Sequence, residues 1–221
     1  MDDAVVQQGF AIAPQVMTDS ERSDLIAALG PVDGAGLRGL LGETAVAALA
    51  RSAKLMELVR AHVGAVATPV RGIYFDKSPE ANWLVAWHQD LTLAVRERRD
   101  VAGFGPWSVK DGVPHVQAPA ERLEQMLAVR LHLDDADEEN GALRVLAGSH
   151  RFGRLSAERI EELRGELPEV VCCARAGDAL LLRPLVLHAS GRSASARRRR
   201  VLHIEYAGFE LPGGLEWHEA G

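Results

Sequence analysis

The sequence predicts a single domain that is mainly β (α+β), in which an antiparallel sandwich or barrel carries helices on one face. Helical periodicity dominates about the first 65 residues, whereas short β-rich runs separated by turn residues fill most of the remainder. The 221 residues, 47% of them hydrophobic, suffice for one well-packed core. We therefore expect one domain over 1–221, with a helical support at about 1–65 and a β core at about 66–210.

The N-terminal part is predicted to open with an edge strand at residues 9–14, where Pro14 is tolerable. The helix that follows has the spacing of a capping box and one apolar face, and it ends at Gly30; its signals are Thr18, Glu21, Leu25, Ile26 and Leu29. The glycine-rich residues 31–42 predict an irregular connection. Apolar residues at helical spacing then predict one helix or two short ones before Gly64.

Most of the rest of the chain is predicted as short strands. These are expected at 70–76, 83–89, 127–133, 142–146, 170–175, 179–187 and 199–206, with a helix at 156–163. A turn at 77–82 should join the first two strands. Residues 92–119 are rich in glycine and proline and show little periodicity, which is typical of an active-site lid or a disordered loop.

Composition excludes several classes of function. No stretch approaches the roughly 18 uncharged apolar residues of a membrane span, and the N-terminus lacks a basic signal region, so we expect a cytoplasmic protein without a membrane partner. The net charge of −6 argues against nucleic-acid binding, despite the basic run 197–200. Cys172 and Cys173 are adjacent and are interpreted as reduced thiols. The oligomeric state stays open.

Two apolar runs lead into residues that bind metals. Residues 83–87 precede His88 and Asp90, which project from one face of a strand because they are two positions apart. Residues 179–187 precede His188. Two imidazoles and one carboxylate form the facial triad of non-haem Fe(II) oxygenases, which leaves three coordination positions open. A hydrogen-bonded His–Asp pair and a core histidine are the alternative interpretations.

Further motifs occur in a fixed order around these residues. Asn-Gly-x-Leu at 140–143 and Gly-Ser-His at 148–150 lie between the pair and the third ligand, and Gly-Asp at 177–178 and Arg199 flank His188. With these motifs, the chain from Gly9 to about Tyr206 resembles the phytanoyl-CoA dioxygenase family of Fe(II)- and 2-oxoglutarate-dependent oxygenases. The resemblance implies a double-stranded β-helix, or jelly roll, with helices packed on one sheet.

The resemblance also implies the ligands of the metal and the cosubstrate. His88, Asp90 and His188 would hold Fe(II), while Ser190 and Arg199 would grip the far carboxylate of 2-oxoglutarate. A guanidinium suits that role because it pairs bidentately with a carboxylate and stays charged when buried. Arg200 is the alternative, since strand alternation lets only one of the two arginines face inward; its spacing from His188 favours Arg199.

Other residues are candidates for lining the pocket. Ile73 would line the cosubstrate, and Arg130 matches a family position in which an aromatic residue can stand, so it would hold either 2-oxoglutarate or an anionic substrate group. The candidate substrate contacts are Lys77 at the entrance, His132 on the strand face of Arg130, His115 in the lid, and Trp107 closing over the pocket. A solvated surface residue is the alternative for Lys77, and a core histidine for His132.

The resemblance implies a dioxygenase that uses Fe(II), 2-oxoglutarate and O2 to hydroxylate a small molecule at an unactivated C–H bond, with release of succinate and CO2. Asp90 favours hydroxylation over halogenation, because related halogenases replace this carboxylate by a small residue. Arg130, Lys77 and His115 favour a small anionic or polar substrate. The alternatives are a non-catalytic, cupin-like jelly roll that binds metal and small molecules, and a cupin-type enzyme without 2-oxoglutarate, for which Arg199 would have no purpose.

Overall fold

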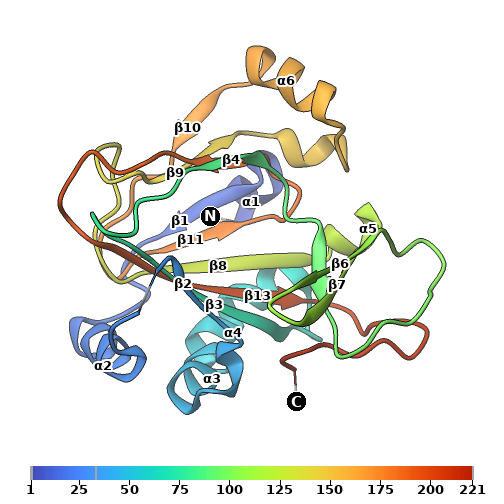
Figure 1. The fold of residues 1–221 in the computed structure, drawn as a ribbon, viewed down its shortest axis with the longest axis horizontal. Coiled ribbons are helices and arrows are strands. Elements are labelled where there is room, and N and C mark those ends of the chain that lie inside the picture. The colour runs from blue at the N-terminus through green and yellow to red at the C-terminus, as the bar shows by residue number, and fades with distance from the viewer. Residues whose placement is uncertain (1, 33, 221) are drawn as a thin grey trace.

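The computed structural model describes residues 2–32 and 34–220. Two antiparallel sheets face each other, and a smaller sheet stands beside them at one end (Figure 1). The larger sheet has six strands in the order β1 (Phe10–Ala13), β11 (Ala179–Leu182), β8 (Met126–His132), β13 (Arg199–Ala207), β3 (Thr68–Lys77) and β2 (Gly36–Arg38). This arrangement confirms the predicted fold class, a jelly roll with helices against one sheet.

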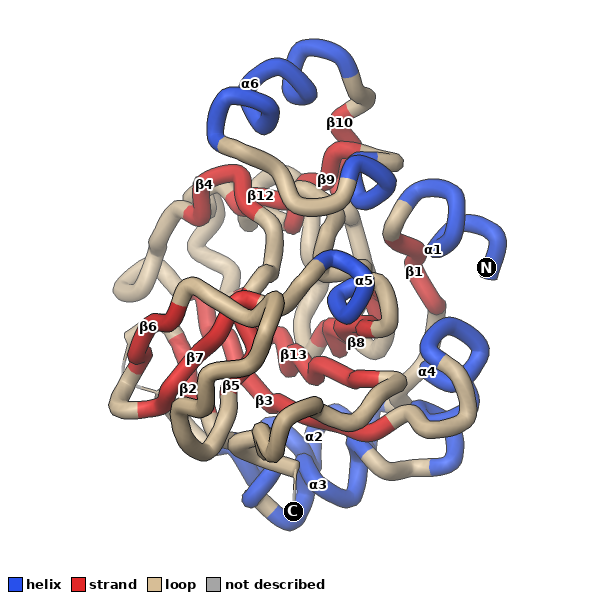
Figure 2. Tube along the Cα trace, turned by 90° about the vertical axis from the view of Figure 1, so that its right-hand side faces the viewer, coloured by secondary structure: helices blue, strands red, loops and turns tan. Residues whose placement is uncertain are grey.

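The opposing sheet has four strands in the order β10 (Glu169–Val171), β9 (Leu143–Leu146), β12 (His188–Ser190) and β4 (Val85–His88). The third sheet consists of β5 (Thr92–Ala94), β7 (Val113–Gln117) and β6 (Trp107–Lys110). Figure 2 shows the hairpin of β6 and β7 beside β5, between the edges of the two larger sheets. The third sheet thus forms a side wall of the space that the two larger sheets enclose.

Helices cover the outer face of the six-stranded sheet. These are α2 (Asp19–Leu29), α3 (Thr44–Ala50) and α4 (Ala53–Val63), while α1 (Asp2–Gln8) packs beside β1 and α6 (Ala157–Glu166) lies beyond the four-stranded sheet (Figure 1). The short α5 (Ala120–Leu123) and two 3-10 turns, Leu40–Gly42 and Ser149–Phe152, complete the helical elements of the described residues. The capping box of Thr18 and Glu21 starts α2 as predicted.

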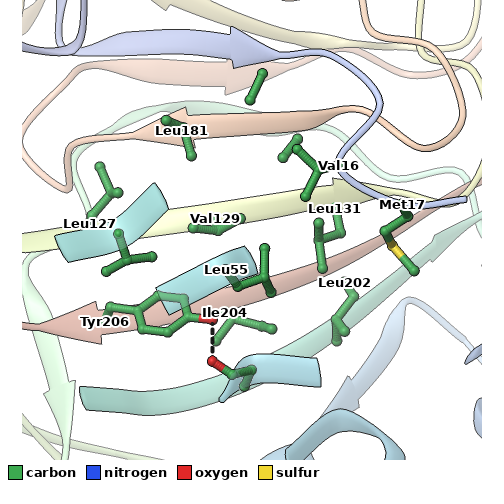
Figure 3. Packing of buried hydrophobic residues seen from close by; sticks show 14 of the residues in the cluster. Val16, Met17, Leu55, Leu127, Val129, Leu131, Leu181, Leu202, Ile204 and Tyr206 are labelled. Carbon is green, nitrogen blue, oxygen red and sulfur yellow. Dashed lines mark hydrogen bonds between the residues drawn. The ribbon is translucent and has the colours of Figure 1, made fainter. Parts of the chain in front are cut away.

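The main core lies between the six-stranded sheet and these helices (Figure 3). Alternate residues of β8, Leu127, Val129 and Leu131, point toward the helices and are fully buried against residues such as Leu55 of α4. Tyr206 of β13 reaches the same core, where its hydroxyl donates to the Ala50 carbonyl oxygen at 2.9 Å. The intervening residues of each strand must therefore point to the other face, into the space between the sheets.

The inner face of the six-stranded sheet is organised in rows by the pairing of β3, β13 and β8. Arg199 of β13 lies opposite Lys77, His203 lies between Ile73 and Arg130, and Glu205 lies between Arg71 and Ala128. Glu205 lies six positions after Arg199, which places the first and last rows about 20 Å apart at the usual rise of a strand. Charged residues thus occupy both ends of this inner face.

Several sequence-based predictions are wrong in detail. The predicted connection 31–42 contains β2, where a Cβ on Gly36 would lie 1.9 Å from the Tyr74 carbonyl oxygen, so the lack of a side chain permits this pairing. The predicted loop 92–119 contains the third sheet, and α1 was not predicted. The strands predicted at 70–76 and 83–89 do not pair, because the connection between them passes from one sheet to the other.

The strand predicted at 179–187 is also shorter than expected. It ends at Leu182, before Pro184, and His188 begins a new strand in the opposite sheet. Proline cannot donate to a ladder of hydrogen bonds, which fits the break in the run. The helix predicted before Gly64 is two helices, one of the two alternatives given.

None of the helices formed by residues 2–32 and 34–220 combines the length and the apolar character that crossing a bilayer requires.

Replacing Tyr206 with Phe should destabilise the fold by about 1–3 kcal/mol, because the buried Ala50 carbonyl loses its donor. Urea unfolding followed by circular dichroism measures this change. Tyr74→Phe is the matched control: Tyr74 is equally buried, but its hydroxyl has no hydrogen bond to a described residue, so its removal should be neutral or stabilising. Equal losses in the two variants would contradict the assignment.

Candidate metal centre and cavity

The two candidate histidine ligands lie on neighbouring strands of the four-stranded sheet. His88 ends β4, His188 begins β12, and the two residues face each other in the strand register. Asp90 follows β4, where its backbone N–H donates to the Pro184 carbonyl oxygen at 2.9 Å. Its two carboxylate oxygens lie 3.6 Å from His88 Nε2 and 3.5 Å from His188 Nε2.

Each imidazole is held in the tautomer that a metal requires. His88 Nδ1 lies 2.9 Å from the Ala86 carbonyl oxygen, and His188 Nδ1 lies 3.0 Å from that of Val186. A carbonyl oxygen can only accept, so both Nδ1 atoms carry a hydrogen, and the Nε2 atoms that face Asp90 are the nitrogens that can bind a metal once they have no proton. One donor atom from each of the three residues lies within 4.8 Å of the others, a set that fits a divalent metal.

The electrostatics of the three residues are coupled. Burial opposes ionisation of Asp90, but the charge and hydrogen bonding of His188 and His88 outweigh it and hold the pKa of this carboxyl far below its usual range. Burial also lowers the pKa of His188, to about 4. For His88 burial acts in the same direction, but the hydrogen bond and charge of Asp90 outweigh it and leave the pKa raised.

A cavity of about 410 Å³ opens beside this cluster, between the two larger sheets. The three candidate ligands line it, as does Ile73. Cationic and apolar side chains from β3, β8 and β13 form its floor, and Trp83, Val85 and Leu143 contribute to the remaining wall. A donor set for a metal therefore faces a space large enough for small molecules.

One end of the cavity is strongly basic and buried. Arg199 is 3% exposed, and its Nη2 lies 3.4 Å from Ser190 Oγ, while Nε donates to the Asn140 carbonyl oxygen at 3.2 Å. Lys77 is fully buried and its Nζ donates to Ser190 Oγ at 3.1 Å and to the Gly191 carbonyl oxygen at 2.6 Å. Neither Arg199 nor Lys77 forms an ion pair with a carboxylate of the described residues.

Burial and mutual repulsion show in the pKa values of these cations. Burial, followed by the charge of Arg199, lowers the pKa of Lys77 to about 8. Burial, followed by the charge of Arg130, lowers that of Arg199 to about 10, so this guanidinium stays charged at neutral pH. Arg200, by contrast, points away from the cavity and pairs with Asp134 at 2.7 Å. The arrangement is that of an anion-binding pocket two residues along β12 from His188.

A second polar chain crosses the floor toward the other end. Arg130 Nη1 lies 3.1 Å from His203 Nδ1, and His203 Nε2 lies 3.4 Å from Glu205 Oε1, which also accepts from Arg71 Nη1 at 3.2 Å. Arginine has no acceptor, so His203 Nδ1 must accept and its proton must sit on Nε2, facing Glu205. The chain therefore fixes a neutral His203 between a cation and a paired carboxylate.

The predicted substrate contacts are distributed differently. Lys77 is buried beside Ser190, which corrects the interpretation of it as a solvated surface residue. The structure places all four predicted substrate contacts outside the lining of the cavity: Lys77, His132, His115 and Trp107. His132 is buried on β8 with neither ring nitrogen hydrogen-bonded to a described residue, and His115 Nδ1 bonds the Val113 carbonyl oxygen. Trp107 packs on an apolar cluster under Arg98.

Several residues of the cavity lining were not among the sequence-based candidates, including four with titratable side chains. Arg71, His203 and Glu205 lie on the floor, and Lys110 lies at its open side. Strand alternation would have found the first three: Arg71 shares a strand face with Ile73, and His203 and Glu205 share one with Arg199. Lys110 belongs to a hairpin that was predicted as a loop.

A jelly roll with two histidines and one carboxylate on a basic cavity is the arrangement of the non-haem oxygenases that use a facial triad. The family model of phytanoyl-CoA dioxygenase (PhyH) matches residues 6–201, which is most of the chain. The protein belongs to this family. The comparison with curated proteins found no match.

Solved structures share the fold. The crystal structure of AviO1 from Streptomyces viridochromogenes Tue57 is 22% identical, with 96% of this chain and 95% of that chain covered and a TM-score of 0.70. HygX from Streptomyces hygroscopicus, solved with nickel and 2-oxoglutarate bound, is 20% identical over 92% of this chain and 84% of that chain, with a TM-score of 0.66. SnoK, a non-haem alpha-ketoglutarate-dependent carbocyclase from nogalamycin biosynthesis, is 16% identical over 93% and 82%, with a TM-score of 0.70.

Lowering the pH should weaken metal binding by protonating His88, and it should do so at a higher pH than for a histidine with an ordinary pKa. The pKa of His88 is raised above 6.5, and a metal must displace its proton. We expect the apparent Ni(II) affinity to fall from about pH 8 to about pH 6, approaching about tenfold per pH unit once His88 is protonated. His188, with a pKa of about 4, binds no proton in this range. Calorimetry in two buffers measures the proton released, and a constant affinity would contradict the expectation.

Proposed function

We propose that the protein is an Fe(II)- and 2-oxoglutarate-dependent dioxygenase that hydroxylates a small molecule at an unactivated C–H bond. The observation that carries this proposal is the position of the basic pocket relative to the metal cluster. Arg199 and Ser190 line the same cavity as His188, and neither Arg199 nor Lys77, which lies behind Ser190, has a carboxylate partner among the described residues. A dicarboxylate that also binds the metal would complete both sites.

The donor set fits Fe(II), since His88, Asp90 and His188 offer two imidazole nitrogens and one carboxylate oxygen and leave three positions open. Ser190 follows His188 by two residues, about 7 Å along β12, which is comparable to the length of a five-carbon diacid. With iron, 2-oxoglutarate and O2 bound, the centre would supply an oxidant strong enough to attack an unactivated C–H bond, with succinate and CO2 as the other products.

The residues of the chain would orient this chemistry. Arg199 would form a bidentate pair with the far carboxylate of 2-oxoglutarate, and Ser190 would donate its hydroxyl to the same group. Lys77 would add a second cation behind Ser190. The hydrogen bonds among Arg130, His203 and Glu205 on the cavity floor fix which ring nitrogen of His203 carries the proton. The reaction needs no proton transfer by these side chains.

Apolar walls would keep water away from the reacting centre. Ile73 and Phe75 on one side and Val85 and Leu143 on the other line the cavity near the cluster. Excluding water limits side reactions of the oxidant and strengthens the interactions that position the substrate. Asp90 occupies the carboxylate position of the triad, which favours hydroxylation over halogenation.

Hydroxylation is one of several outcomes that this fold supports. SnoK is described as a carbocyclase, and SnoN, a second protein of nogalamycin biosynthesis whose solved structure shares the fold, is described as an epimerase. Different oxidative outcomes thus occur on one scaffold, and the placement of the substrate carbon decides among them.

We also propose that the protein is cytoplasmic, because Cys172 and Cys173 are both free thiols.

Anaerobic titration with Fe(II) and 2-oxoglutarate tests the proposal. Bidentate binding of a keto acid to Fe(II) produces a visible charge-transfer band, which we expect in the wild type and not in His88→Ala. Arg199→Ala should raise the 2-oxoglutarate concentration needed for the band by at least about tenfold, since a charge-assisted contact is lost.

Arg200→Ala is the matched control, because Arg200 is the next residue in sequence but pairs with Asp134 outside the cavity. It should leave the 2-oxoglutarate titration unchanged. A folded, iron-loaded wild type without the band would refute the 2-oxoglutarate mechanism and favour a non-catalytic binding module. Equal effects of the two arginine variants would refute the role of Arg199.

A further inference from the structure

The charges that line the cavity are unbalanced. Two carboxylates, Asp90 and Glu205, face five cationic side chains, which are Arg38, Arg71, Lys110, Arg130 and Arg199. Fe(II) and 2-oxoglutarate carry equal and opposite charges, so loading the proposed centre would not correct this excess. Positive charge held in a partly desolvated space is costly unless an anion accompanies it.

Pairing within the protein identifies which cation is free at the open side of the cavity. Arg38 pairs with Asp111 at 2.6 Å, and Arg71 pairs with Glu205 at 3.2 Å. Lys110 has no carboxylate of the described residues within ion-pair distance, and its Nζ donates to Thr92 Oγ1 at 3.1 Å. Lys110 is therefore the cation without a counter-charge at this side.

Lys110 lies on the opposite side of the metal cluster from the basic pocket. Thr92, which it contacts, follows Asp90 by two residues, and the charges that act on Lys110 include Arg71, Asp90 and Glu205. The row of Arg71 and Glu205 is about 20 Å from the row of Lys77 and Arg199. A five-carbon diacid bound between iron and Arg199 would not reach this end.

Resting on the proposed function, we propose that the substrate is a small organic carboxylate and that Lys110 is the residue that binds its carboxylate. A single carboxylate would supply the counter-charge that Lys110 lacks at this side of the cavity. Apolar residues such as Leu37 and Ile73 also line the cavity, so the acid carries an apolar body. The carboxylate would be held at the mouth while a carbon of that body faces the metal.

The hairpin that carries Lys110 supports this assignment. Asp111 and Gly112, with φ of +51° and +79°, form the two-residue turn between β6 and β7, and positive φ at both residues gives a tight hairpin whose twist matches that of its strands. The Arg38–Asp111 pair ties that turn to β2 of the six-stranded sheet. Lys110 is thus an exposed cation on an anchored element rather than on a free loop.

Calorimetry on protein loaded with Ni(II) and 2-oxoglutarate tests the assignment. The probes are hexanoate, octanoate and phenylacetate, each compared with its primary amide, which keeps the shape and removes the charge. We expect at least one acid to bind more tightly than its amide, and Lys110→Met to weaken that acid at least about tenfold while leaving the amide unchanged. Lys110→Arg, which keeps the charge, should retain most of the affinity.

Lys54→Met is the matched control, since Lys54 lies on α4 outside the cavity and should have no effect on the acids. Binding of no acid in preference to its amide, or equal acid affinity in wild type and Lys110→Met, would overturn the inference. 2-Oxoglutarate affinity is measured in the same samples before the acids are added. If the wild type does not bind 2-oxoglutarate, the result counts against the proposed function. If it binds 2-oxoglutarate but shows no preference for acids over amides, the result counts against Lys110 alone.

Discussion

The pairing of β4 with β12 is the constraint on which the site depends. It places His188 directly opposite His88, with the two rings tilted at a centroid distance of 4.2 Å. The Pro184 carbonyl, which accepts from the Asp90 backbone, brings the carboxylate to the same point. Two strand ends and one backbone hydrogen bond thereby assemble three donor atoms from segments about a hundred residues apart in sequence.

The six-stranded sheet provides the charged floor of the cavity beside the metal cluster. Its outer face packs on the helices and gives the sheet rigidity, so its inner face can hold charged side chains in fixed rows. Those rows place cations at both ends of one cavity, with a neutral His203 between them. Burying so many like charges costs stability, which is expected where a site is shaped for anions.

Sequence analysis recovered the parts that local patterns encode. The capping box of α2 and the alternation of β8 follow from spacing, and the order of the motifs indicated the family, whose resemblance pointed to Arg199 rather than Arg200 as the inward arginine. The boundaries of the strands near the site could not be predicted from these local patterns. The run 179–187 reads as one strand, and only tertiary pairing shows that it stops before Pro184 and that His188 belongs to the other sheet.

The hairpin of β6 and β7 was missed for a related reason. Its Asp111-Gly112 turn is a hairpin signal, but the flanking residues carry two prolines and little alternation, so the strands depend on pairing with each other and with β5. Lys110 and its neighbours therefore escaped notice, while Trp107 and His115 were given roles that their positions do not suggest. The ion pair of Glu205 and Arg71 also needed the register, because these two residues meet only through the pairing of β13 with β3.

The central claim is that His88, Asp90 and His188 hold iron while Arg199 holds the far end of 2-oxoglutarate. Anomalous diffraction from crystals grown anaerobically with Fe(II) and 2-oxoglutarate tests it most directly. The account predicts one iron peak about 2 Å from both Nε2 atoms and from an Asp90 oxygen, with the free carboxylate of 2-oxoglutarate against Arg199. An iron peak elsewhere, or a 2-oxoglutarate whose free carboxylate points to Arg71, would contradict it.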